Sequence, residues 1–282
     1  AYTRDLETTN RSLERFVPRQ FLEYLKRESI VKVRLGDQVQ KHMTIMFADI
    51  RSFTSLSETM TPEETFNFIN SYLNRVGPII RRNDGFIDKY IGDAILALFD
   101  SSPAAAVEAA LEIHREIKRY NGVREETHRE PIEVGIGVHT GLLMLGTIGE
   151  EERIENTVIS DSVNLASRLD ALTKNFGARI LITRDVVDSL PADRHKLRFL
   201  GRIAVKGKDV PADVFEVLDD EDPDVIQRKL DTADTFRAGF RLLAASKHQE
   251  AHEVFERVLQ TNPGDLAALY YRERCRKVMW LS

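Results

Sequence analysis

Two aspartates lie where this chain is expected to turn, and their side chains could share a metal ion. Asp49 ends the apolar run 44–50, and Asp93 follows Gly92 in the middle of the β-prone segment 87–99, a pattern typical of a hairpin. Two carboxylates at the ends of neighbouring strands repel each other unless a divalent cation lies between them. Because oxygen ligands favour hard cations, the pair predicts a Mg²⁺ or Mn²⁺ site.

A second polar pair lies on a predicted helix that opens at Ser160. Asn164 and Arg168 are four residues apart and therefore share one face of that helix. The opposite face carries an apolar stripe of Leu165, Leu169 and Leu172. Spacing alone favours a solvated helix face for this polar pair, since any surface helix shows polar residues at such intervals.

Composition bounds the class of protein. The chain has 282 residues, of which 42% are hydrophobic, enough for one substantial core and a smaller unit. A net charge of −5 with interspersed signs gives no broad cationic surface, so we expect no nucleic-acid partner. Cys275 is the only cysteine, which excludes an internal disulfide and fits a cytoplasmic location. No apolar run is long enough to predict a membrane span.

A helix is predicted after each of the two segments that contain the aspartates. Thr61, Pro62 and Glu64 form a capping-box start, and the helix that follows should end near Gly85. A second helix is predicted over 103–120 from its apolar spacing.

Strand signals complete the pattern. Alternation places Asp49 on the same face as Ile45 and Phe47, and the glycine-rich segment 132–148 is expected to form a further pair of strands. The order strand, helix, hairpin, helix, strands predicts an α+β sandwich with helices packed on one sheet.

The two ends of the chain are expected to be separate units. Residues 1–40 predict a connector from a missing regulatory region, and the spacing of Leu6, Leu13 and Phe16 fits either the end of a coiled coil or a solvated helix. The acidic run 219–224 contains a proline and predicts a solvated linker.

Residues 225–282 predict a helical segment like a tetratricopeptide repeat, with a generic helical hairpin as the alternative. The repeat assignment depends on four positions: Gly239, Ala251, Phe255 and Pro263. A lone repeat cannot bury both of its faces, so it must pack on the main domain, on a twin or on missing chain.

Three segments together identify a family. Residues 47–54, 89–93 and 164–168 closely resemble the class III nucleotidyl cyclases, most of all the cyanobacterial adenylyl cyclases related to bicarbonate-responsive enzymes. The resemblance implies a ferredoxin-like α/β sandwich for a catalytic domain over 41–218. It also implies conversion of ATP to 3′,5′-cyclic AMP and pyrophosphate, and it raises bicarbonate as a possible activator.

The resemblance gives roles to the residues singled out above. It implies that Asp49, Asp93 and the carbonyl of Ile50 hold two Mg²⁺ or Mn²⁺ ions per site. It implies that Asn164 orients the ribose and that Arg168 stabilises charge on the transferring phosphate.

Further positions match the substrate-binding residues of the family. Lys89 matches the lysine that contacts adenine, where guanylyl cyclases usually carry Glu, and Thr157 stands where many adenylyl cyclases have Asp. Arg179 and Lys206 match residues that contact the triphosphate.

In this family the active site lies between two catalytic domains. The resemblance therefore implies a head-to-tail homodimer with two shared sites, each taking its metal ligands from one chain and Lys89, Thr157, Asn164 and Arg168 from the other. Three alternatives stay open: a guanylyl cyclase, a diguanylate cyclase, and a catalytically silent nucleotide-binding dimerisation module. Lys89 argues against the first, and the absence of a Gly-Gly-acidic-acidic-Phe signature argues against the second.

Overall fold

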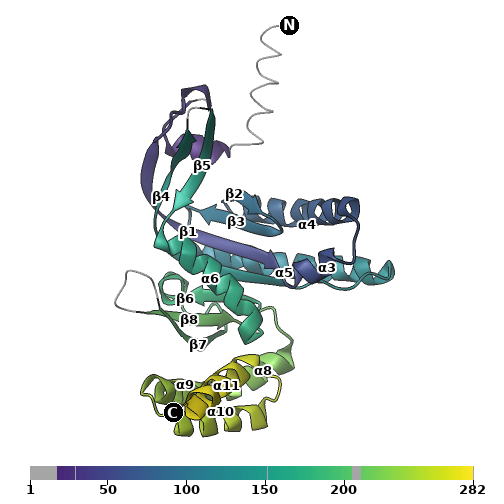
Figure 1. The fold of residues 1–282 in the computed structure, drawn as a ribbon, viewed down its shortest axis with the longest axis vertical. Coiled ribbons are helices and arrows are strands. Elements are labelled where there is room, and N and C mark those ends of the chain that lie inside the picture. The colour runs from purple at the N-terminus through teal and green to yellow at the C-terminus, as the bar shows by residue number, and fades with distance from the viewer. Residues whose placement is uncertain (1–17, 29, 151, 205–210, 282) are drawn as a thin grey trace.

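The computed structural model describes residues 18–28, 30–150, 152–204 and 211–281 (Figure 1). The predicted coiled-coil segment with Leu6, Leu13 and Phe16 lies outside these residues, as does Lys206. None of the helices in the described part has the length and apolar character needed to span a bilayer.

One mixed sheet organises the molecule. Its strands pair in the order β2-β3-β1-β4-β6-β8-β7, and β5 pairs with the far half of β4. The strands are β1 Gln38–Ile50, β2 Gly85–Ile91, β3 Ala94–Phe99, β4 Val134–Glu150, β5 Arg153–Ile159, β6 Ile180–Thr183, β7 Leu197–Ile203 and β8 Ala212–Val217. All neighbours are antiparallel except β4 and β6.

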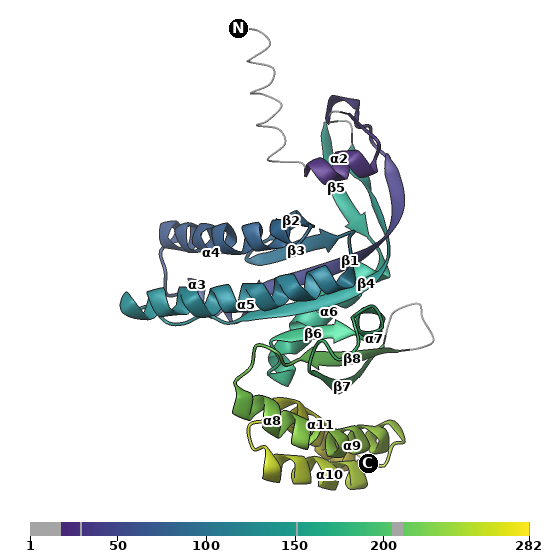
Figure 2. The ribbon, with the colours of Figure 1, turned by 180° about the vertical axis from the view of Figure 1, so that it is seen from behind.

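The helices lie on both faces of this sheet and beyond its far edge (Figures 1 and 2). They are α2 Arg19–Tyr24, α3 Phe53–Ser57, α4 Pro62–Arg82, α5 Pro103–Glu126, α6 Asp161–Phe176, α7 Arg184–Val187, α8 Pro223–Asp231, α9 Ala233–Ala244, α10 His248–Thr261 and α11 Leu266–Leu281, with a 3-10 turn at Ile30–Lys32.

The order β1-α4-β2-β3-α5-β4 is a ferredoxin-like unit, which confirms the predicted fold class. Helices α4 and α5 share a core with Met46 and Ala48 of β1, whereas Ile45 and Phe47 pack on the opposite side with Ala166 of α6. This alternation is the one that the apolar run of β1 predicts. The predicted capping box is present, with Thr61 and Glu64 bonded reciprocally, and α4 ends at Arg82 as expected.

The prediction of a strand pair within 132–148 was wrong. This segment is a single long strand, β4, which pairs along β1 and then forms a hairpin with β5. Its glycines mark close approach and not turns, because a Cβ at Gly137 would lie 2.4 Å from the backbone nitrogen of Asp170 and 2.5 Å from the carbonyl oxygen of Ala166 in α6. The glycine therefore lets α6 pack directly on the sheet.

Helix α5 also runs past the predicted end at Tyr120, as far as Glu126. Asn121 does not cap the helix, because its amide exchanges two hydrogen bonds of 2.8 Å with the backbone of Ile132. The side chain thus fixes the return of the chain towards β4, while the helix continues.

The C-terminal helices form a unit that packs on the mixed sheet (Figure 2). Helices α9 and α10 pair as the repeat pattern predicts, with Gly239 of α9 facing Phe255 of α10. Both Ala251 and Phe255 are fully buried. A lone repeat could pack on the main domain, on a twin or on missing chain, and in this structure the C-terminal unit packs on the main domain.

A shared hydrophobic core joins the C-terminal unit to α6 and to strands β6 to β8. Leu165 and Leu169 of α6 belong to the same cluster as Phe236, Phe255 and Tyr271. Gly201 in β7 has a φ of 137°, and a Cβ there would lie 2.1 Å from the Tyr271 hydroxyl. The sheet is therefore shaped to receive α11, and the sole cysteine, Cys275, is buried in this core.

Candidate active site

The two predicted metal ligands meet at one edge of the sheet. Asp49 lies near the end of β1, and Asp93 lies in the two-residue turn between the neighbouring strands β2 and β3. The Asp93 carboxylate accepts a hydrogen bond of 3.2 Å from the backbone nitrogen of Ile50. The structure thus brings Asp49, Ile50 and Asp93 together, as their spacing predicts.

The electrostatics of this edge favour a bound cation. Burial, a hydrogen bond with Asp93 and the charges of Asp93 and Asp170 raise the pKa of Asp49 to about 8. Burial and the charge of Asp93 likewise raise the pKa of Asp170 to about 7, although Arg51 opposes the shift. These three carboxylates repel one another, and the chain does not neutralise them fully.

The oxygen atoms at this edge fit a divalent ion. Asp49 Oδ1 is buried and accepts no hydrogen bond from the described residues. Buried acceptors are normally satisfied, so this atom needs a partner from outside the chain. A hard divalent cation would supply such a partner, and Asp49 and Asp93 are the carboxylates that could hold it.

The predicted base-contacting residues also meet. Lys89 Nζ donates a hydrogen bond of 3.1 Å to Thr157 Oγ1 and one of 3.3 Å to the Asn156 carbonyl oxygen. The register of β2 against β3 shifts between Ile87 and Lys89, so a bulge at this point aims the lysine towards β5.

Lys89 lies in the wall of a hollow of about 700 Å³ that also exposes Asn156 and Glu155. Asp88 borders the same hollow, its carboxylate 3.6 Å from Lys89 Nζ. Burial raises the pKa of Asp88 to about 6, against the opposing charge of Lys89. The hollow is large enough for a heterocyclic base and offers a cation, a hydroxyl and a carbonyl at its edge.

Asn164 and Arg168 lie on the exposed face of α6, opposite Leu165 and Leu169, as predicted. Ser160 caps this helix by accepting a hydrogen bond from the Val163 nitrogen. Arg168 Nη1 donates a hydrogen bond of 2.6 Å to the carbonyl oxygen of Ala204, just after β7. The guanidinium is thus held at the end of β7, and Lys206 lies outside the described residues.

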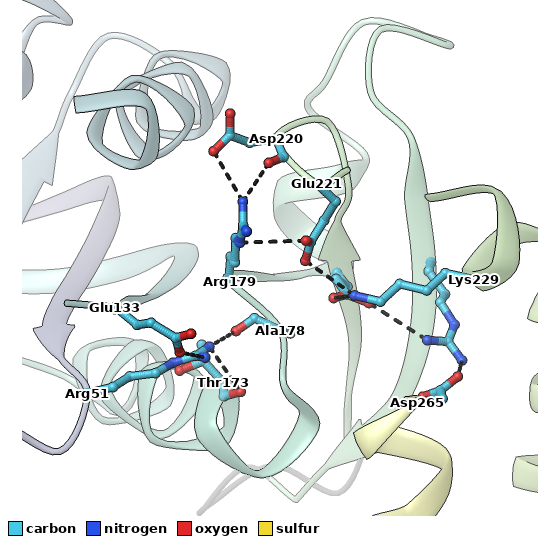
Figure 3. Close-up of polar contacts among 11 residues, drawn as sticks. Arg51, Glu133, Thr173, Ala178, Arg179, Asp220, Glu221, Lys229 and Asp265 are labelled. Atoms are coloured by element: carbon cyan, nitrogen blue, oxygen red, sulfur yellow. Dashed lines mark hydrogen bonds and ion pairs between the residues drawn. The ribbon is translucent and has the colours of Figure 1, made fainter. Parts of the chain in front are cut away.

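Arg179 lies in a different environment (Figure 3). Its Nη1 donates a hydrogen bond of 2.6 Å to the Asp220 carbonyl oxygen, and its guanidinium lies 3.6 Å from the carboxylates of Asp220 and Glu221. Glu221 also pairs with Lys229 at 3.3 Å. The acidic run was expected to be a solvated linker, but these two residues are partly buried because they neutralise Arg179 and Lys229.

Within the described residues, no hydrogen bond or ion pair joins the three groups to one another. The pair of Asp49 and Asp93, the pair of Lys89 and Thr157, and the helix face of Asn164 and Arg168 are separate in one chain.

Sequence reasoning missed three residues around these groups. Arg51 forms an ion pair of 2.8 Å with Glu133 and donates to the carbonyl oxygens of Thr173 and Ala178 (Figure 3). It thereby ties the end of β1 to the end of α6. The other two are Asp88, whose carboxylate lies 3.6 Å from Lys89 Nζ, and Asp170, whose charge helps to raise the pKa of Asp49. Arg51 directly follows Ile50 and Asp88 directly precedes Lys89, which was the available signal for these two, whereas the spacing of Asp170 from Asn164 and Arg168 gave none.

Comparison with known proteins places this geometry in a family. A model of the adenylate and guanylate cyclase catalytic domain matches residues 35–216. An adenylate cyclase of Anabaena cylindrica is 43% identical over 219 residues, which cover 75% of this chain and 44% of that protein. A terminal-differentiation specific adenylate cyclase of Dictyostelium discoideum is 35% identical over 280 residues, covering 96% of this chain and 13% of that protein.

Among solved structures, a bacterial light-regulated adenylyl cyclase is similar with a TM-score of 0.66 and 26% identity, covering 77% of this chain and 62% of that one. The chain spans less than half the length of the two relatives named above. Catalytic domains of the matched family bind a nucleotide, act as dimers and use divalent metals. Since the family model covers most of the chain, the protein belongs to the family of adenylate and guanylate cyclase catalytic domains.

Proposed function

We propose that the chain is the catalytic part of an adenylyl cyclase, which converts ATP to 3′,5′-cyclic AMP and pyrophosphate. Residues 41–218 form the catalytic domain in this proposal, 1–40 the connector from a regulatory region, 219–224 the acidic segment and 225–282 the helical unit. The observation that carries the proposal is the hydrogen bond from Lys89, which lines a hollow large enough for a base, to Thr157.

This pair matches the hydrogen-bonding edge of adenine. The Lys89 ammonium donates to the ring nitrogen N1, and the Thr157 hydroxyl accepts from the exocyclic amino group. Guanine instead presents donors at its ring nitrogen and amino group, which an ammonium cannot accept. The pair therefore favours ATP over GTP.

The reaction requires an in-line attack of the ribose 3′-hydroxyl on the α-phosphate and little covalent chemistry from the protein. In the proposed site Asn164 orients the ribose, and the Arg168 guanidinium stabilises charge on the transferring phosphate. Lys206 holds the triphosphate, and Arg179 would have to exchange its pairs with Asp220 and Glu221 for the phosphates to do so as well. Two Mg²⁺ or Mn²⁺ ions held by Asp49, the Ile50 carbonyl and Asp93 would help to activate the hydroxyl and neutralise the leaving group.

The proposed enzyme is a head-to-tail homodimer with two shared sites. Large apolar side chains remain exposed in the single chain on the β4–β5 arm and on the β2–β3 hairpin. They are Tyr90, Ile91, Leu142, Ile148, Ile154 and Ile159. Such a surface beside Lys89 and Asp93 is suited to burial against a second copy.

Product analysis tests the function directly. Purified protein is given ATP or GTP with Mg²⁺ or Mn²⁺, and the products are separated by chromatography. Cyclic AMP from ATP supports the proposal. Cyclic GMP, a cyclic dinucleotide, or no product would each support one of the rival functions. The Lys89→Glu variant should weaken ATP use and permit some GTP use, and unchanged kinetics with both nucleotides would remove Lys89 from base selection.

Complementation tests the shared sites. Asp49→Ala and Arg168→Ala chains should each be nearly inactive alone and recover activity when mixed, because a mixed dimer carries one site with both residues intact. Random pairing makes half of the dimers mixed, so recovery should approach at most roughly a quarter of wild type. Two affinity tags measure the mixed dimers independently. Abundant mixed dimers without activity would place Asp49 and Arg168 on the same side of the interface.

A bicarbonate response is the least direct part of the proposal, because it is supported by Thr157 and the family resemblance alone. Turnover should rise with bicarbonate at fixed pH and ionic strength. A flat response would remove bicarbonate as an activator.

A further inference from the structure

A buried arginine far from the proposed catalytic groups has no counter-ion. Arg124 lies near the end of α5 and is only 3% exposed. Its Nε donates a hydrogen bond of 2.7 Å to the carbonyl oxygen of Glu130. No carboxylate among the described residues lies within ion-pair distance of this guanidinium, and neither Nη atom has a hydrogen-bond partner there. A buried charge is normally paired, so this one requires an explanation.

Aromatic rings hold the guanidinium in place. The Arg124 Cζ atom lies 4.9 Å from the ring centroid of Phe68 and 5.6 Å from that of Tyr120. Both rings are themselves buried. Contacts of this kind stabilise the cation through the faces of the guanidinium and fix the plane of that group. They satisfy none of its Nη donors.

The Arg124 guanidinium borders a cavity of about 470 Å³. The cavity lies between α3, the first turns of α4 and the end of α5, which the ribbon shows side by side (Figure 2). Neither Nη atom of Arg124 is among the buried polar atoms that lack a partner, so these donors reach the cavity surface. Thr59, Asn67 and Ser71 add neutral polar groups to its wall.

The acidic groups of the cavity wall do not neutralise Arg124. The Glu64 carboxylate accepts a hydrogen bond of 2.8 Å from the Thr61 nitrogen and is used in the capping box. Hydrogen bonds from the backbone and side chain of Thr61 lower the pKa of Glu64, so this group stays anionic. Glu130 offers its carbonyl oxygen to Arg124, and its side chain is exposed.

We propose that this cavity is a binding site for a small planar oxyanion, a carboxylate or bicarbonate, held by the two Nη groups of Arg124. A planar guanidinium matches two oxygens of such an anion in a bidentate contact, and burial strengthens that contact. Arg129 and His128 also line the cavity, and Glu64 is held close to the charge of Arg129, so Arg124 is the buried cation left for the anion. The proposal does not depend on the catalytic assignment, because the cavity shares no residue with the proposed active site.

Binding is measured by thermal unfolding of the full chain in acetate or bicarbonate, replacing chloride at constant ionic strength and pH. The melting midpoint of wild type should rise and follow the saturation law ln(1 + [L]/Kd) for each anion. Arg124→Gln, and Arg124→Lys which keeps the charge but loses the fork, should weaken binding at least about 10-fold. Arg119→Gln, on the exposed part of the same helix, should bind as wild type does.

A second pair of variants locates the site even if the Arg124 variants fail to fold. Asn67→Asp places a carboxylate in the cavity wall and should weaken binding at least about 10-fold by repulsion. Asn70→Asp is the matched control, exposed on the same helix but outside the cavity, and should have no effect. No saturable response in wild type, equal binding in Asn67→Asp and Asn70→Asp, or tighter binding of phosphate than of either planar anion would overturn the proposal.

Discussion

Buried carboxylates occur in two regions of this molecule and are treated in opposite ways. At the end of β1, the charges of Asp93 and Asp170 help to raise the pKa of Asp49, and Asp49 Oδ1 accepts no hydrogen bond from the described residues. At the junction with the C-terminal unit, each buried carboxylate has a cation (Figure 3). Asp265 pairs with Arg198, and Glu216 lies 2.6 Å from Lys229 Nζ.

This difference in charge pairing distinguishes a candidate binding site, beside β1, from a structural network, at the junction with the C-terminal unit. Burial alone raises the pKa of Glu216, but Lys229 and Arg198 oppose the rise. This network is complete within the chain, so it holds α11 against β7 and β8 and needs nothing further. The carboxylates beside β1 lack such partners within the described residues, and in the proposed function a divalent cation would neutralise them.

Replacing one carboxylate in the incomplete region gives the largest expected effect. Asp49→Asn should reduce cyclisation to background, because the metal loses a charged ligand. The metal-free variant should also unfold at a higher temperature than wild type, since the substitution removes a repelled buried charge. Turnover during a metal titration and calorimetry with a chelator measure the two effects. Normal turnover, or a metal-free variant less stable than wild type, would contradict the proposed difference between the two groups of carboxylates.

The same change in the complete region should have the opposite effect on stability. Asp265→Asn keeps the shape of the side chain but leaves Arg198 with Glu216, 3.9 Å away, as its nearest counter-ion. Breaking a buried pair in this way costs about 3–5 kcal/mol. Urea unfolding measures the loss. Asp213→Asn is the control, since its pair with Arg202 is largely exposed and should contribute less than about 1 kcal/mol.

A buried histidine between the two regions predicts a pH effect. Burial and the charge of Arg179 lower the pKa of His114 to about 3. Below pH 6.5 the unfolded chain binds a proton at this site and the folded protein does not, so stability falls as the pH falls. The expected loss is about 2 kcal/mol at pH 5. Between pH 7 and pH 5, the free energy of unfolding of His114→Gln should fall by about that much less than the free energy of unfolding of wild type. An equal fall in both proteins would show that His114 is not held neutral in the folded protein.

Asp88 is the intermediate case and gives the smallest expected effect. Its pKa of about 6 lies above the ordinary value, so the folded protein binds more protons between about pH 4 and pH 6 and loses stability as the pH rises through that range. Asp88→Asn should therefore stabilise the protein more at pH 8 than at pH 4, and the loss of the contact with Lys89 offsets part of the gain. Denaturant melts at the two pH values measure this difference. Equal effects at both values would show that Lys89 fully compensates Asp88.

Local sequence predicted the parts of the fold that depend on local signals. The alternation of β1, the capping box at Thr61 and the paired C-terminal helices follow from periodicity and turn residues. The error in β4 arose because Gly137 looks the same in sequence whether it makes a turn or admits a helix. Only the packing of α6 separates the two.

The candidate site shows the same division. Asp49 and Asp93, and Lys89 and Thr157, come together as predicted because they end or neighbour paired strands. The partners of Arg179 could not be predicted, since Asp220 and Glu221 are more than forty positions away and look like a solvated run. Arg124 was missed for a related reason, because an arginine on an amphipathic helix is usually exposed.

The core that α11 shares with α6 determines when the protein can finish folding during synthesis. Leu165 and Leu169 are translated long before Tyr271 and Cys275, yet all four fill one cluster. A nascent chain that has reached only the acidic run 219–222 exposes this apolar face and leaves Arg198 without Asp265. Chains truncated at that point are therefore expected to be recognised by chaperones and proteases, so that only complete copies accumulate.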